Sequence, residues 1–258
     1  MNLLPEALGG GLLVGLALGL TGGGGSILAV PYLLYILGFD LRAAVKISLA
    51  VVGLTSSFGA VMQRREVVWK AGAVLGAGGI FGAPLGAWLG TQLPETLVLL
   101  LFAALMIFIS LRFLRGGGVA EVPISRFGCA VAPGESRPRF HWSCAAKLLV
   151  AGSIAGVLAG LFGVGGGFIL VPALMMVARL SLTSALSTSL LSISILSAVS
   201  FSANAGMGEA VNWPLTGIFL IGAFLGMIGG IQLKQHIPPA LLRKIFALSV
   251  LAIAVAMI

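Results

Sequence analysis

The sequence predicts an all-α polytopic membrane protein with two inverted-topology repeats, each a glycine-broken, two-armed segment plus three transmembrane helices. Three observations predict this fold class: the composition, an internal repeat and the distribution of the basic residues. Of the 258 residues, 59% are hydrophobic and only 9% are charged, whereas about 25% of the residues in a soluble domain are charged. Apolar runs of roughly 20 residues, the length that spans a bilayer, occur throughout the chain.

The internal repeat is clearest at two glycine-rich stretches. Residues 19–31 read GLTGGGGSILAVP, and residues 160–172 read GLFGVGGGFILVP. The same offset then places Ser48 opposite Ser189 and Gln63 opposite Asn204, and after a three-residue shift the match resumes with Trp213 opposite Trp69. We therefore divide the chain into a first transmembrane repeat at 1–115, a linker at 116–144 and a second transmembrane repeat at 145–258.

Each half is expected to hold one broken segment and three uninterrupted spans. In the first half these are 5–37, broken at 21–25, and then 42–62, 69–90 and 95–114. In the second half they are 145–178, broken at 163–167, and then 183–203, 212–233 and 239–257. Prolines lie near the starts of several of these spans, where helices tolerate them. The stretch between the halves has the glycine, proline and mixed charge of a linker.

The basic residues favour an inverted arrangement because Lys and Arg concentrate in cytoplasmic loops. If each broken segment crossed the bilayer once, the loop at 234–244 would lie opposite the basic loops at 63–70 and 112–147. If each broken segment instead enters and returns, all Lys and Arg residues except Arg42 and Lys46 share one side. The prediction is a multi-pass protein of the cell inner (plasma) membrane with both termini extracytoplasmic and the linker cytoplasmic.

The glycine breaks are the first candidate binding site. A helix broken inside lipid has unpaired backbone groups that protein or a water-lined cavity must satisfy. A second arm that begins near Ser26, or near Gly167, aims N–H groups and a positive dipole end at mid-membrane, which favours an anion. The expected contacts are Gly22, Gly23, Gly24, Gly25, Ser26, Gly165, Gly166 and Gly167. Elsewhere, we interpret glycines as close helix–helix contacts, namely Gly72, Gly76, Gly82, Gly86, Gly222, Gly226 and Gly230.

The helices that follow the breaks hold the second candidate site. Matching faces of these two helices carry small hydroxyl and amide side chains: Ser48, Ser56, Gln63, Thr188, Ser189, Ser197 and Asn204. Lys46 is the one basic residue in this region, and a charge inside a span indicates function by default. Two structural alternatives stay open. Hydroxyls in such helices often bind the carbonyl of the preceding turn, and Lys46 lies near enough to a helix end to extend to the interface.

The acidic and metal-ligating residues limit the chemistry that the chain can perform. All seven Asp and Glu residues fall at span ends or in loops, so we expect neither a proton relay nor a metal-cation path. Cys129, Cys144 and His141 lack the spacing of a metal site, and the two cysteines are expected to be reduced thiols. We therefore expect no enzyme activity and no metal or cofactor. The expected partners are a small anion and membrane lipid, without nucleic acid, and a homo-oligomer is left open.

The chain also resembles a known family. GLTGGGGSILAVPYLL followed by AAVKISLAVV, and GLFGVGGGFILVPALMM followed by SALSTSLLSI, are similar to the TauE/SafE sulfite exporters, which are built from two repeated halves. The resemblance implies an anion transporter that exports sulfite or small organosulfonates across the inner membrane. It also implies substrate contacts at the glycine turns and the Ser/Thr positions after them, whereas Lys46, Gln63 and Asn204 are inferred from the residues alone. A passive anion channel and an intramembrane enzyme remain alternatives.

Overall fold

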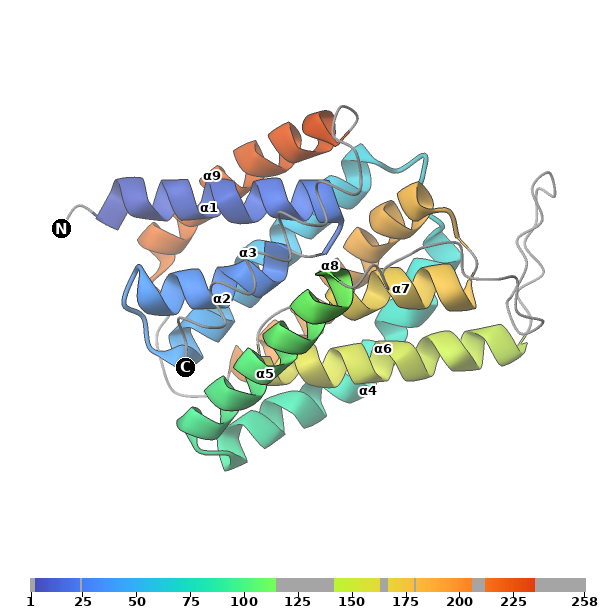
Figure 1. The fold of residues 1–258 in the computed structure, drawn as a ribbon, viewed down its shortest axis with the longest axis horizontal. Helices are drawn as coiled ribbons and strands as arrows, with labels where there is room; N and C mark the ends of the chain where they lie inside the picture. The colour runs from blue at the N-terminus through green and yellow to red at the C-terminus, as the bar shows by residue number, and fades with distance from the viewer. Residues whose placement is uncertain are drawn as a thin grey trace.

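A computed structural model describes residues 3–23, 25–114, 142–162, 167–178, 180–205 and 212–234. Every regular element within these residues is an α-helix (Figure 1). In chain order they are α1 (Leu3–Thr21), α2 (Gly25–Tyr35), α3 (Leu41–Met62), α4 (Trp69–Gln92), α5 (Glu95–Leu114), α6 (Trp142–Phe162), α7 (Gly167–Val177), α8 (Leu182–Ala205) and α9 (Trp213–Leu233).

Six of the helices in the described residues are long and apolar enough to cross a membrane. They cover Leu4–Thr21, Leu41–Met62, Trp69–Gln92, Cys144–Phe162, Thr183–Asn204 and Trp213–Leu233. The predicted all-helical, multi-pass architecture is therefore confirmed, whereas the inverted orientation of the two halves stays a prediction. The predicted span at 239–257 and most of the linker at 116–144 lie outside the described residues.

The surface of the long helices suits a lipid environment. Phe81 and Leu85 on α4, and Ile221 on α9, are large apolar side chains that face outward. Trp69 and Trp213 are exposed at the first residues of α4 and α9, where a membrane protein places aromatic side chains at the lipid–water interface. The outward faces of α4 and α9 are therefore apolar enough to face lipid.

The first helix of each half packs against a helix of the other half. α1 lies along α9, while α6, the repeat counterpart of α1, lies along α4, the counterpart of α9. The counterparts α3 and α8 pack against each other and are the most buried of the spanning helices. In Figure 1, α1 and α2 lie toward the end of the molecule that carries the N-terminus, and α6 and α7 extend toward the opposite end. The pattern of helix contacts is thus the same when the halves are interchanged.

Glycines at every fourth position explain how closely α1 approaches α9 and α6 approaches α4. The four stripes are Gly11, Gly15 and Gly19 on α1, Gly222, Gly226 and Gly230 on α9, Gly78, Gly82 and Gly86 on α4, and Gly152, Gly156 and Gly160 on α6. A Cβ atom added to Gly15 would overlap the carbonyl oxygen of Ala223. A Cβ on Gly82 would overlap that of Ser153 in the same way. The interpretation of Gly82, Gly86, Gly222, Gly226 and Gly230 as close-contact residues is therefore confirmed.

The ends of the helices follow local sequence signals. Asp40 precedes α3, and its Oδ2 accepts a hydrogen bond from the Ala43 backbone N–H at 3.0 Å. Asn212 precedes α9, and its Oδ1 accepts from Leu215 N–H at 3.3 Å. Such side chains satisfy one of the free N–H groups at a helix start. The Asp40 cap fixes where α3 begins, and the start of α3 lines the pocket described below.

One expectation about the cysteines is wrong. Cys144 is buried in α6, with 1% of its side chain exposed, and it is disulfide-bonded rather than a reduced thiol. The two cysteines can be counted from the sequence, but their oxidation state cannot be inferred from it. Cys129 lies outside the described residues.

Candidate functional site

The two glycine breaks meet inside the molecule. α1 ends at Thr21 and α2 begins at Gly25, while α6 ends at Phe162 and α7 begins at Gly167. A Cβ atom added to Gly23 would lie 2.7 Å from the Gly167 carbonyl oxygen. A Cβ on Gly167 would lie 2.6 Å from the Gly23 Cα. The two backbones therefore touch, and neither position has room for a side chain. Gly24, Gly165 and Gly166 lie outside the described residues.

Hydroxyl groups satisfy the carbonyl groups that the first break frees. Gly22 has a φ of 66°, a left-handed conformation that favours glycine. Its carbonyl oxygen accepts a hydrogen bond from Ser189 Oγ at 2.6 Å, and the Gly23 carbonyl oxygen accepts one from Ser26 Oγ at 2.7 Å. Ser26 and Ser189 thus lie at the first break, and their hydrogen bonds hold its shape. Gly25 begins α2, packed against the Val14 and Leu18 backbone of α1.

Unpaired hydroxyls lie on the facing helices α3 and α8. Ser56 and Ser197 occupy equivalent positions in the two halves, and both side chains are 0% exposed. Within the described part of the chain, neither hydroxyl has a hydrogen-bond partner, and the same holds for Thr55 and Ser200. A buried polar group without a partner costs about 1–3 kcal/mol. A polar ligand or water that reached any of these four hydroxyls would stabilise it.

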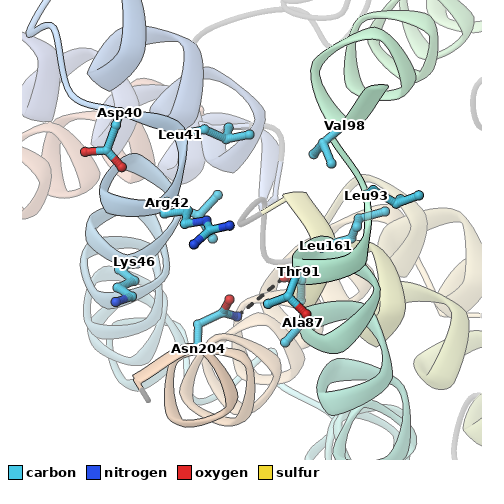
Figure 2. Close-up of a pocket in the computed structure, with 13 residues that line it drawn as sticks. Asp40, Leu41, Arg42, Lys46, Ala87, Thr91, Leu93, Val98, Leu161 and Asn204 are labelled. Carbon is cyan, nitrogen blue, oxygen red and sulfur yellow. Dashed lines mark hydrogen bonds between the residues drawn. The ribbon is translucent and has the colours of Figure 1, made fainter. Parts of the chain in front are cut away.

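A pocket of about 270 Å³ lies at the start of α3 (Figure 2). Its lining comes from the start of α3, the end of α4, the beginning of α5, the end of α6 and the end of α8: Asp40, Leu41, Arg42, Val45, Lys46, Ala87, Gly90, Thr91, Leu93, Val98, Gly160, Leu161 and Asn204. The α6 residues lie just before the second glycine break. The pocket therefore lies beside the end of α6, whereas the described residues of the breaks are not part of its lining.

Two basic side chains and one acidic side chain, that of Asp40, give this pocket a net positive charge. Arg42 is exposed, and Figure 2 shows its guanidinium group in the space between α3 and the α4–α5 side. Lys46 follows one turn later on the same helical face and is only 3% exposed. Sequence reasoning selected Lys46 but missed Arg42. The signal was available, because these are the two basic residues that the predicted orientation leaves unexplained.

Asn204 lies at the floor of the pocket, with its donors already used. Its Nδ2 donates to the Ser200 carbonyl oxygen at 2.8 Å and to the Gly160 carbonyl oxygen at 3.4 Å, the second bond being drawn in Figure 2. An amide has two N–H donors, so Asn204 holds the end of α6 against α8. Arg42 and Lys46 are the basic residues in the lining of the pocket.

Gln63, the repeat counterpart of Asn204, lies in a separate cluster. Its Oε1 is 3.1 Å from Ser187 Oγ and 3.4 Å from Lys234 Nζ. Ser187 Oγ is also 2.9 Å from Glu66 Oε2. Burial lowers the pKa of Lys234, and the nearby Glu66 charge offsets part of that shift. Sequence reasoning did not select Glu66, Ser187 or Lys234, because only the fold brings the ends of α3, α8 and α9 together.

The predicted residues therefore do not form one site. Lys46 and Gln63 are 17 positions apart on α3, and at 1.5 Å per residue this separation is about 25 Å. A small anion cannot contact both at once. Thr188 Oγ1 accepts a hydrogen bond from Val68 N–H at 2.9 Å, which anchors the loop before α4. Ser48 is fully buried in α3.

The described residues contain no group of three or more His, Cys, Asp and Glu side chains arranged to hold a metal ion. The described residues do contain a pocket with a net positive charge, four buried hydroxyls without partners and two helix breaks in contact. These groups can bind and desolvate a small polar ion, and the described part of the chain has no cluster suited to metal-dependent chemistry.

Known proteins are similar in sequence to this chain along most or nearly all of its length. The profile of the family described as sulfite exporter TauE/SafE matches residues 7–257. A "Probable membrane transporter protein" of Xylella fastidiosa (strain Temecula1) is 32% identical over 260 residues, which cover 98% of this chain and 94% of the relative. "Probable membrane transporter protein YunE" of Bacillus subtilis (strain 168) is 28% identical over 84% of this chain and 83% of its own length.

A longer relative also matches, "Probable membrane transporter protein MamO" of Magnetospirillum gryphiswaldense, with 27% identity over 99% of this chain and 45% of the relative. No solved structure matches the chain. The names of these relatives state membrane transport and do not state a substrate. The chain belongs to the TauE/SafE family and is a multi-pass membrane transporter.

Proposed function

We propose that the protein exports a small oxyanion, sulfite or a short organosulfonate, across the inner membrane. The observation that carries this proposal is the position of Arg42 and Lys46. These two basic residues do not fit the charge distribution that orients the rest of the chain, yet both line the same pocket. A charge within the membrane region is costly and usually serves a functional site. The description of the family as sulfite exporters supports the choice of anion.

The route of the anion follows the contact between α3 and α8. Arg42 and Lys46 draw the anion into the pocket, where Gly160 and Leu161 lead to the second break. The hydroxyls of Ser56 and Ser197 offer donors to an oxyanion along the way. At the breaks, α2 and α7 begin at Gly25 and Gly167, so their free N–H groups and positive dipole ends favour the same charge.

The proposed transport cycle needs access from both sides, and an inverted repeat supplies it. Two copies of the same hairpin that enter from opposite faces give two equivalent vestibules, as in other inverted-repeat transporters. We place both termini outside and the linker in the cytoplasm. The disulfide at Cys144 favours an oxidising compartment for the linker, which disagrees with this orientation. The proposed orientation is the one in which all Lys and Arg residues except Arg42 and Lys46 lie on the cytoplasmic side.

A thermal-shift screen of the purified full-length protein tests the proposed substrate class. Sulfite, sulfate, thiosulfate, methanesulfonate and ethanesulfonate are compared, because a ligand that binds only the folded state raises the melting temperature. We expect a concentration-dependent rise with sulfite or a sulfonate and none with matched chloride. A protein that responds to no oxyanion would contradict the proposal.

A further inference from the structure

Four polar side chains meet at the end of α3 that faces away from the pocket. We refer to Gln63, Glu66, Ser187 and Lys234 as the Glu66 cluster. Ser187 Oγ lies 2.9 Å from Glu66 Oε2, 3.0 Å from the Thr183 carbonyl oxygen and 3.1 Å from Gln63 Oε1, and its one proton is donated to one of them at a time. Lys234 Nζ lies 3.4 Å from Gln63 Oε1. Ser187 is 0% exposed, whereas Glu66 is an exposed residue of the turn after α3. The Glu66 carboxylate therefore reaches from the surface to a buried hydroxyl.

The Glu66 cluster occupies the place that the pocket occupies in the other repeat. Gln63 corresponds to Asn204 and Ser187 to Lys46 at one offset, and Lys234 corresponds to Gly90 at the offset after the three-residue shift. Asn204, Lys46 and Gly90 all line the pocket. The pocket and the Glu66 cluster thus each hold one lysine and one amide, although the lysine comes from a different helix in each. The pocket is open, whereas the Glu66 cluster is crossed by side-chain hydrogen bonds.

We infer that Gln63, Ser187 and Lys234 line a second oxyanion site, and that the Glu66 carboxylate occupies this site in the present structure. The inference rests on the proposed anion transport. A carboxylate presents oxygen atoms that share one negative charge and accept hydrogen bonds. A sulfonate does the same with three oxygen atoms. The Ser187 hydroxyl, which contacts Glu66, and the Lys234 ammonium group, which contacts Gln63 and feels the charge of Glu66, are therefore suited to either anion.

Exchange between Glu66 and a transported anion is chemically reasonable in this setting. Glu66 belongs to an exposed turn, so its carboxylate regains hydration when it leaves the cluster. The incoming anion keeps Lys234 beside a negative charge, which a half-buried ammonium group requires because burial lowers its pKa. A neutral solute offers no such compensation. The Glu66 cluster therefore selects for anions and stays closed without one.

Binding measurements on charge variants of the full-length protein test the inference. Glu66→Gln removes the competing charge, so we expect the Kd for sulfite or methanesulfonate to fall about tenfold. Lys234→Met removes the cation, and the Kd should rise about tenfold. Arg65→Gln and Lys70→Met alter exposed charges near the same end of α3 and should change the Kd less than about twofold.

A free carboxylate supplies a second readout that does not depend on one variant. In Glu66→Ala, formate should bind in place of the missing side chain and weaken methanesulfonate binding, whereas in the wild type formate should have little effect. This variant also serves if Glu66→Gln does not fold.

The outcomes separate the inference from the proposed function. If the wild type binds the anion, while Glu66→Gln and Lys234→Met leave the Kd unchanged, the second site is wrong and the proposed function stands. If formate competes equally in wild type and Glu66→Ala, the occupancy by Glu66 is wrong. If neither the wild type nor Glu66→Gln binds any oxyanion tested, both proposals fail.

Discussion

At the scale of single residues, Lys46 and Arg42 show what burial adds to a sequence. The sequence places Lys46 one turn into a helix, where extension to the interface is as reasonable as a binding role. The structure buries Lys46 beside a pocket whose mouth carries Arg42. The structure also shows that the predicted donors at Asn204 are used by backbone carbonyl groups. Residue identity alone predicts a candidate, and the direction of its hydrogen bonds decides its role.

Replacement of Lys46 by methionine keeps the length of the side chain and removes its charge. We expect the apparent affinity for the anion to fall about tenfold, because a charge-assisted hydrogen bond contributes about 1.5–3 kcal/mol. Lys70→Met is the control, since Lys70 is exposed at the start of α4. The Kd from thermal-shift titration checks this prediction. Equal affinity in Lys46→Met and the wild type would exclude Lys46 from the binding site.

Two serines of α8 provide a matched comparison of binding and stability. Ser189→Ala leaves the Gly22 carbonyl oxygen without its donor and should lower the free energy of unfolding by about 1–3 kcal/mol. Ser197→Ala removes a hydroxyl that has no partner in the described residues. The free energy of unfolding should therefore stay unchanged or rise by up to about 1–3 kcal/mol, while anion flux falls. Denaturation in detergent and flux in liposomes measure the two effects, and equal destabilisation would contradict this assignment.

At the scale of elements, the sequence predicts helix ends better than helix partners. The span predicted at 42–62 is α3 (Leu41–Met62), and the span predicted at 69–90 is α4 (Trp69–Gln92), because capping and loop residues mark such ends locally. The interruption predicted at 21–25 falls between α1 and α2. Glycines at every fourth position predict close packing, but they do not identify the partner. The packing of α1 on α9 and of α6 on α4 depends on tertiary contacts that no local sequence signal encodes.

Two glycines of α9 test the close packing of α1 on α9. Gly226→Ala places a Cβ atom against the Leu12 carbonyl oxygen, whereas a Cβ atom on Gly229 meets nothing within 4 Å. We expect Gly226→Ala to destabilise the protein by about 1–3 kcal/mol, the usual effect of overpacking. Gly229→Ala should be neutral or stabilising by up to about 1 kcal/mol. Unfolding in detergent measures both, and similar effects at the two positions would contradict the packing.

The contact between the two breaks can be tested in the same way. Gly167→Ala introduces a methyl group 2.6 Å from the Gly23 Cα, so the breaks must move apart and the N–H groups lose their alignment. Anion affinity should fall at least tenfold, as expected when a charge-assisted hydrogen bond is lost, while the protein still inserts into the membrane. Gly217→Ala is the control because a Cβ atom there meets nothing within 4 Å. Unchanged affinity in Gly167→Ala would remove the breaks from the binding site.

At the scale of the whole molecule, the repeat relates positions in the two halves that hold different side chains. The same offset that relates Gln63 to Asn204 relates a closed cluster to an open pocket. The sequence cannot predict which of the two is open, because that depends on how side chains from α3, α8 and α9 meet. If the protein alternates access as proposed, one of these places is open while the other is closed.

The inverted orientation predicts the sides on which equivalent helix ends lie. Gln92 and Gln232 are exposed near the ends of the counterparts α4 and α9. In a background without Cys129 and Cys144, single cysteines at these positions should react with a membrane-impermeant maleimide from opposite sides. Reaction of both from the same side would mean a parallel repeat and would also remove the argument from Arg42 and Lys46.

Counterflow in liposomes tests the central claim most directly. The purified protein is reconstituted, and uptake of labelled sulfite or methanesulfonate is measured with and without the same unlabelled anion on the opposite side. A transporter with two alternately open vestibules predicts saturable uptake that the opposite anion accelerates and that Lys46→Met weakens. Uptake that rises linearly with concentration and ignores the opposite anion would instead indicate a passive channel and would contradict the account.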